Sequence, residues 1–112
     1  MPTSEDANLV MQIVQWSTNM GLDEAMQEIF SDGYDPNDTS SEDEAVRKVL
    51  AFGETVGTLV KHGLLDWDLL SDLFWIDGMW KKVAAHAVAL RERLGEPRIY
   101  EHFESLAARS GS

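Results

Sequence analysis

The chain has 112 residues, a length typical of one folded domain, and its 44% hydrophobic and 26% charged residues are typical of a globular protein and not of a disordered one. It contains no cysteine, which excludes disulfide bonds, a thiolate nucleophile and any cysteine zinc site. The formal net charge is -11, and no lysine or arginine precedes Arg47. Eleven of the twenty carboxylates lie before Arg47, so we expect one face of the folded protein to be negative.

The first segment is predicted to form two helices. Thr3 and Asp6 have the spacing of a capping box, and apolar residues then recur with helical spacing until Gly21 favours a helix end. A shorter apolar stripe follows from Leu22 and ends at Gly33. We expect residues 1–33 to form an acidic, antiparallel helical hairpin.

Residues 34–41 are predicted to form an exposed loop, because this stretch is rich in Pro, Asn, Asp and Ser and lacks apolar periodicity. Its acids suggest a calcium site. An EF-hand loop that began at Asp35, however, would need glycine at Ser40 and glutamate at Val46. We therefore expect a solvated loop whose acids cap helices, and no metal site.

A long central helix is predicted next. Ser41 and Glu44 have capping-box spacing, and Gly63 should end the helix. Gly53 and Gly57 on this helix would let another helix approach closely. The heptad-like seam that faces the rest of the bundle consists of Val46, Val49, Gly53, Val56 and Val60.

The remaining sequence predicts three more helices. Asp66 is expected to cap a short helix, Asp77 to cap the next, and Gly95 to end that one, while a last helix begins with Tyr100. No segment alternates with a period of two. We therefore expect one all-α domain, a compact bundle of five to six helices with no sheet, in which residues 42–109 form the helical core framework.

The second half of the chain resembles the bacterial helical family known as domain of unknown function 4760, over about residues 46–107. The motifs that carry the resemblance are VLAFGETVGTLVKHGLLDWDLLSDLF from Val49 to Phe74, then Trp80, Arg91, Pro97 and YEHFESLA from Tyr100 to Ala107. The resemblance implies an all-helical fold and no assigned activity. Many relatives look as if they begin with a membrane helix, which this sequence lacks, so we carry over no membrane attachment.

Glu54 and Arg91 are candidates for a structural ion pair. Glu54 follows Gly53 on an otherwise apolar helix, and Arg91 lies near the end of the helix that carries Trp80. A pair between them would satisfy both charges and fix the register of two helices, whereas an isolated buried glutamate could act as a base. We expect the pair.

Catalytic and metal-binding signatures are missing from the sequence. His62, His86 and His102 are the only histidines, and no two of them have the i, i+4 spacing of a helical metal site. The chain contains neither GxSxG nor a glycine-rich phosphate loop. We predict no catalytic residue, metal or cofactor, although a site assembled across helices stays open.

The tryptophans suggest a contact surface. Trp67, Trp75 and Trp80 lie close in sequence and could meet at one corner, either as core residues or as an exposed hot spot for a partner. Together with Gly53 and Gly57 they form the candidate interaction surface.

Three functions are compatible with these observations. The leading hypothesis is a soluble, cytoplasmic interaction or assembly module that binds another protein or itself, since the sequence shows no signal peptide and no membrane span. An alternative is an acidic mimic of nucleic acid that inhibits a DNA- or RNA-binding protein, while the same charge disfavours direct nucleic-acid binding. A second alternative is a bundle that binds a small ligand with Glu54 and His86.

Overall fold

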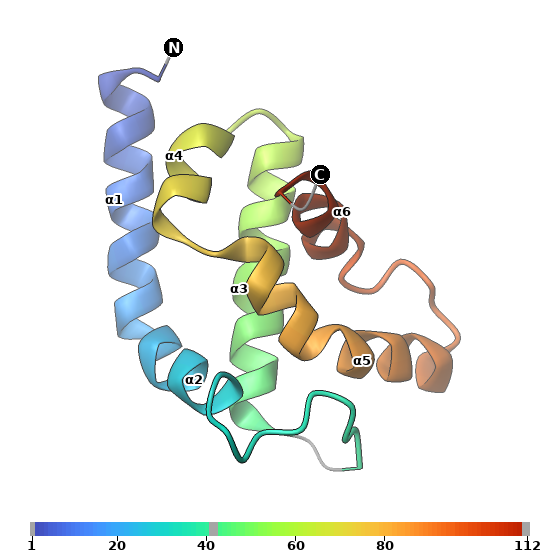
Figure 1. Ribbon diagram of the computed structural model, residues 1–112. Helices are drawn as coiled ribbons and strands as arrows, with labels where there is room; N and C mark the ends of the chain where they lie inside the picture. The colour runs from blue at the N-terminus through green and yellow to red at the C-terminus, as the bar shows by residue number, and fades with distance from the viewer. Residues whose placement is uncertain (1, 41–42, 111–112) are drawn as a thin grey trace.

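The computed structural model describes residues 2–40 and 43–110, and these residues form six helices and no strand (Figure 1). The predicted all-α fold is therefore confirmed. The helices are α1 (Ser4–Asn19), α2 (Leu22–Ile29), α3 (Glu44–Lys61), α4 (Trp67–Leu73), α5 (Ile76–Leu94) and α6 (Glu101–Ser110). Among the described residues, no helix combines the length and the apolarity needed to cross a membrane.

Two helices begin with the predicted caps. At the start of α1, the Thr3 N–H donates to Asp6 Oδ2 at 2.7 Å and Thr3 Oγ1 accepts from the Asp6 N–H at 3.1 Å, which completes a capping box. At the start of α4, Asp66 Oδ2 accepts from the Leu69 N–H at 3.0 Å. Both starts are fixed by side chains within the first turn, which is why the sequence alone predicts them.

Two other helix starts differ from the prediction. The cap of α3 is Asp43, whose Oδ1 accepts from the N–H of the second helical residue at 2.8 Å, while Ser41 lies outside the described residues. Asp77 does not cap α5, because that helix already begins at Ile76, after Trp75. Asp77 instead lies in the first turn, where the positive end of the helix dipole stabilises its negative charge.

The predicted helix ends are largely confirmed. Gly21, Gly63 and Gly95 follow α1, α3 and α5, and their φ angles of 82°, 72° and 67° are left-handed conformations that end a helix at little cost for glycine. The second helix is shorter than predicted, since α2 ends at Ile29 and not at Gly33.

The predicted antiparallel hairpin of residues 1–33 is not confirmed. In Figure 1, α2 leaves the end of α1 at an angle instead of folding back along it. The apolar stripe of α2 is buried and packs mainly against α3, and α1 contacts α4 as well as α2. The left-handed turn at Gly21 redirects the chain toward the central helix, where more apolar surface is available.

Helix α3 occupies the centre of the bundle and contacts α2, α5 and α6 (Figure 1). Phe52 of α3 is fully buried between the ring of Trp16 on α1, at a centroid distance of 5.6 Å, and the ring of Phe74, at 4.9 Å. The buried residues of α3 include most of the predicted seam and are Ala45, Val46, Val49, Leu50, Phe52, Gly53, Val56 and Gly57.

The two central glycines of α3 are the positions where α6 approaches. A Cβ atom added to Gly57 would lie 2.6 Å from the carbonyl oxygen of His102, and one added to Gly53 would lie 2.2 Å from the ring of Phe103. Neither distance is tolerated between real atoms. The close approach predicted from these glycines is therefore made by a helix of the same chain.

We predict that Gly57→Ala lowers the free energy of unfolding by about 1 to 2 kcal/mol, because the clash with a backbone oxygen outweighs the better helix propensity of alanine. Urea denaturation measures the effect. Gly33→Ala is the control, since a Cβ atom there meets nothing within 4 Å and should change stability little. Equal stability of the two variants would show that α6 does not lie close enough to Gly57 to clash with a methyl group there.

Candidate functional site

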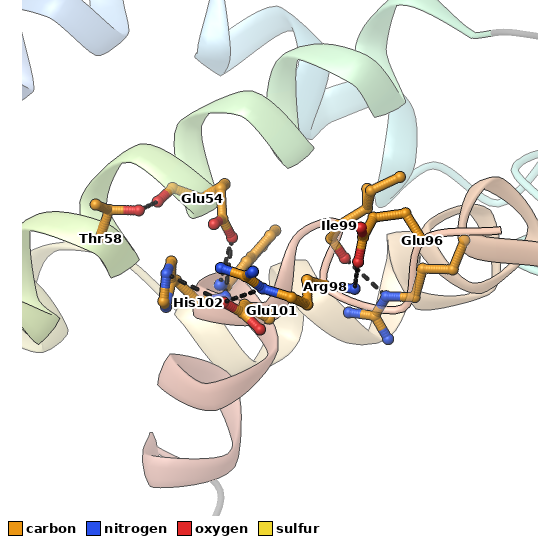
Figure 2. A network of polar contacts seen from close by, with 9 residues as sticks. Glu54, Thr58, Glu96, Arg98, Ile99, Glu101 and His102 are labelled. Atoms are coloured by element: carbon orange, nitrogen blue, oxygen red, sulfur yellow. Dashed lines mark hydrogen bonds and ion pairs between the residues drawn. The ribbon is translucent and has the colours of Figure 1, made fainter. Parts of the chain in front are cut away.

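Glu54 caps the first turn of α6 from another helix. Its Oε1 atom accepts the backbone N–H groups of His102 and Phe103, both at 3.0 Å (Figure 2). Tyr100, the residue just before α6, has a φ of 59°. The two N–H groups need an acceptor because the N–H groups in the first turn of a helix have no partner within that helix. The negative carboxylate of Glu54 is also stabilised by the positive end of the helix dipole.

The predicted ion pair between Glu54 and Arg91 is replaced by separate contacts. Arg91 Nε donates to the carbonyl of Ile99 at 2.7 Å, and Arg91 Nη1 lies 3.0 Å from Glu104 Oε1. The backbone of α6 provides the partner for Glu54, while Arg91 fastens the segment before α6 to that helix. Each charge has a partner, but a different group from the one predicted, and Arg91 Nη2 is buried without a hydrogen-bond partner among the described residues.

A more exposed set of charges surrounds this junction (Figure 2). Glu101 Oε1 lies 3.5 Å from His102 Nε2 and 3.7 Å from Arg98 Nε, and Glu96 Oε1 accepts the Arg98 N–H at 3.0 Å. Solvent-exposed pairs of this kind contribute little to stability. The network therefore has a local role in shaping the turn before α6, with no arrangement of nucleophile and base.

The tryptophan corner is built around Trp75, one of the exposed large apolar side chains. We use this name for Trp67, Trp75, Phe30 and Gly78. Trp75 is 64% exposed, and its ring stacks on Phe30 with a centroid distance of 5.6 Å and an interplanar angle of 14°. A Cβ atom on Gly78 would lie 2.3 Å from the indole of Trp75, so the ring can occupy this position only because Gly78 has no side chain. Trp67 and Trp75 line one hollow of about 330 Å³.

Three of the predicted interaction residues lie elsewhere. Trp80 is half-buried and packs edge-on against Phe103, with ring centroids 5.1 Å apart. Gly53 and Gly57 are buried beneath α6. Only Trp67 and Trp75 therefore come together at the surface, because α6 covers the rest of the predicted surface.

Cations accompany the aromatic rings of the tryptophan corner. Lys82 Nζ lies 5.5 Å from the centroid of the Phe30 ring, and the Arg109 guanidinium lies 5.3 Å from the Trp67 ring. Both distances fall within the range of cation–π attraction. The carboxylate of Asp77 also lines the hollow and pairs with Lys81 Nζ at 3.1 Å. The corner thus already holds positive groups against its aromatic faces.

The acids of the 34–40 loop mainly build turns. Asp35 Oδ1 accepts the Asn37 N–H at 2.9 Å, and Asp38 Oδ1 accepts the N–H and hydroxyl of Ser40 at 3.0 and 2.6 Å. The bonds from Ser40 hold the pKa of Asp38 below its usual value. No group of metal-binding side chains occurs within the described part of the chain.

Tyr34 fastens this loop to α5. Its hydroxyl donates to the carbonyl oxygen of Lys82 at 2.6 Å. Burial, and then the negative charges of Asp43, Glu28 and Asp35, raise the pKa of Tyr34 to about 12. The loop therefore lies over α5 instead of extending freely into solvent.

The three histidines lie in different surroundings. His62 is exposed and caps the end of α3, whereas His102 faces the groove between α3 and α6. His86 lines a second hollow between the loop, α3 and α5, and its Nδ1 atom is buried without a hydrogen-bond partner. Within the described residues, His86 and His102 thus line two different hollows.

Sequence reasoning missed the parts of the site that depend on contacts between helices. The apolar spacing that begins at Leu22 places Phe30 on a helix stripe without indicating its partner, and the predicted elements give Gly78 no role. The spacing of Trp75 and Gly78, three residues apart at a helix start, is a usable signal, because such residues lie on one face of a helix. Nothing local indicates that Phe30 lies beneath Trp75.

Comparison with known proteins gives one match. The model of the family described as "Domain of unknown function (DUF4760)" matches residues 3–110, which is nearly the whole chain. No curated protein and no solved structure shows a significant match.

We predict that Glu54→Ala lowers the free energy of unfolding by about 1 to 2 kcal/mol, since two N–H groups of α6 lose their acceptor. Glu54→Gln keeps an oxygen acceptor and should cost less, about 0.3 to 1 kcal/mol, through the lost charge at the helix start. Urea denaturation and amide hydrogen exchange at His102 and Phe103 measure both effects.

The matched control for this prediction is Glu92→Ala, which removes an exposed carboxylate from α5. We expect it to change stability by less than about 0.5 kcal/mol. If Glu54→Ala behaves like Glu92→Ala and leaves exchange at the start of α6 unchanged, Glu54 does not cap that helix.

Tyr34 should ionise only near pH 12 in the folded protein. A raised folded pKa means that the fold favours the protonated phenol, so this contribution to stability is complete below pH 10 and is lost as the pH rises from 10 to about 12. Alkaline titration, followed by the absorbance of tyrosinate, measures this ionisation. The step at the highest pH, which we assign to Tyr34, should be absent in Tyr34→Phe and present in Tyr100→Phe. Retention of that step in Tyr34→Phe would contradict the assignment.

Proposed function

Because this chain belongs to the family described as Domain of unknown function (DUF4760), a description that assigns no activity, we propose its function from the chemistry of its surface. We propose that it is a protein-interaction module that binds a basic segment of another protein at the tryptophan corner. In this proposal Trp75 is the aromatic anchor, and the acidic first half of the chain attracts the partner.

The observation that carries the proposal is the exposure of an indole whose position is fixed. Trp75 is 64% exposed although it stacks on Phe30 and rests above Gly78. Leaving so much of a tryptophan in water forgoes stabilisation that burial would give. An exposed aromatic side chain held in one orientation loses little entropy on binding, and tryptophan is enriched among the residues that dominate interface energies.

The chemistry of the corner favours a basic segment. Aromatic faces attract guanidinium and ammonium groups, and Asp77, whose carboxylate pairs with the exposed Lys81, lines the adjacent hollow. Arg109 over Trp67 and Lys82 over Phe30 already make this type of contact within the chain. A partner cation over the exposed face of Trp75 would extend the same pattern.

The charge of the whole chain supports the same partner. The net charge is -11, and Phe30, which follows α2, belongs to the part that holds eleven carboxylates before the first base, Arg47. A negative field of this kind accelerates encounter with basic partners. It also opposes pairing of two copies, so we favour a different protein over self-association.

The experiment is isothermal titration calorimetry with a short arginine-rich peptide, its lysine counterpart and its glutamate counterpart. We expect the two basic peptides to bind and Trp75→Ala to weaken their affinity by about 10-fold or more, which corresponds to about 1.4 kcal/mol. Gly78→Ala keeps the indole but displaces it, so it should weaken binding as well. Urea denaturation verifies that each variant is folded.

Leu94→Ala is the matched control, because Leu94 is 61% exposed but lies at the other end of α5. It should leave peptide affinity unchanged. Undiminished affinity in folded Trp75→Ala, or equal binding of the glutamate peptide, would refute the role of the corner. Binding that depends on the carboxylates but not on Trp75 would instead favour the acidic mimic of nucleic acid.

A further inference from the structure

His86 presents a buried nitrogen that nothing in the described structure satisfies. Its Nδ1 atom is buried and has no hydrogen-bond partner, although buried polar atoms in proteins are nearly always paired. His86 lies on α5 and faces a hollow that is also lined by α3 and the 34–40 loop. The imidazole ring therefore lines a hollow that another molecule can enter, while the Nδ1 atom itself lies buried beneath the ring's exposed edge in this structure.

The hollow next to His86 has one apolar wall and one polar wall. Its volume is about 280 Å³, near the lower limit of the pockets that hold small molecules. Val46, Leu50 and Leu90 supply aliphatic surface, and Arg47, Arg93 and Tyr100 supply polar groups. We call this hollow the His86 pocket.

We propose that the His86 pocket binds a small organic carboxylate with an apolar body. The carboxylate would accept hydrogen bonds from the arginines and, after a rotation of the imidazole that brings it to the hollow, from His86 Nδ1, while the apolar part would contact Leu50 and its aliphatic neighbours. This inference goes beyond the proposed interaction with a protein, because the pocket and the tryptophan corner share no residue.

The charges of the pocket favour an anion. Among the described lining residues, Arg47 and Arg93 bring two guanidinium groups against the single carboxylate of Asp43. Both arginines also take part in interactions within the protein. A guanidinium has five N–H donors and matches the two oxygens of a carboxylate, so it can add such a partner to those it has.

The size and shape of the pocket favour a compact ligand. Tyr100, held in a left-handed conformation just before α6, contributes to its wall; its phenol is protonated at neutral pH, and burial raises the pKa of its hydroxyl further. A short aliphatic or a single-ring aromatic acid fits a pocket of this size, whereas a nucleotide does not.

The test uses phenylacetate and hexanoate as probes, with phenylacetamide and hexanamide as neutral counterparts of the same shape. Two-dimensional NMR of the full chain should show saturable shifts that are centred on His86, Leu90 and Tyr100 for the acids. The acids should bind at least ~10-fold more tightly than the amides, the ratio expected when a charged hydrogen bond is replaced by a neutral one.

Two variants are designed to abolish binding by different routes. His86→Gln removes the imidazole and should weaken acid binding by ~10-fold or more, since each 1.4 kcal/mol is a factor of ten. Ala89→Phe fills the pocket, because Ala89 lines it, and should exclude the acids. His62→Gln, at an exposed histidine outside the pocket, should leave binding unchanged.

Failure of both acids to cause saturable shifts in the folded wild-type chain overturns the proposal. Equal affinity for acid and amide, or unchanged affinity in folded His86→Gln, overturns it as well. Trp75→Ala separates this test from the previous one, since it should weaken binding of basic peptides and leave phenylacetate binding intact.

Discussion

Gly53 and Gly57 let the backbone of α6 lie directly against α3, and Glu54, placed between them in sequence, accepts the N–H groups of the first turn of α6. The two glycines, which leave space, and the carboxylate of Glu54, which provides an acceptor, therefore act at the same contact and stabilise this arrangement of the two helices. The contact also buries Phe103, whose ring packs edge-on against Trp80 of α5. The positions of α5 and α6 thus depend on little more than one turn of the central helix, from Gly53 to Gly57.

The features of the surface follow from this arrangement. Because α6 lies on α3, its last turn brings Arg109 over Trp67, and the two tryptophans of the corner line one hollow. The start of α5 meets the end of α2, which brings Phe30 beneath Trp75. The polar pocket around His86 lies between the loop, α3 and α5. Both proposed binding sites are therefore formed by segments that are distant in sequence.

The acidic first half has two physical roles. Asp6, Asp35, Asp38 and Asp43 are used locally, because their oxygens cap helices or close turns. That use does not remove their charge, so the long-range field of a chain with a net charge of -11 persists. The asymmetry around Arg47 thus has a structural explanation at short range and supports the proposed attraction of a basic partner at long range.

The sequence by itself determined the all-α class, the helix ends at glycine and the caps made by Thr3 and Asp66, because each depends on interactions within about one turn of the chain. It also determined that Gly53 and Gly57 allow a close approach. Only the tertiary structure decided which helix makes that approach, which group Glu54 binds, and which tryptophan stays exposed. Those outcomes depend on contacts between residues far apart in the chain, about which local spacing carries no information.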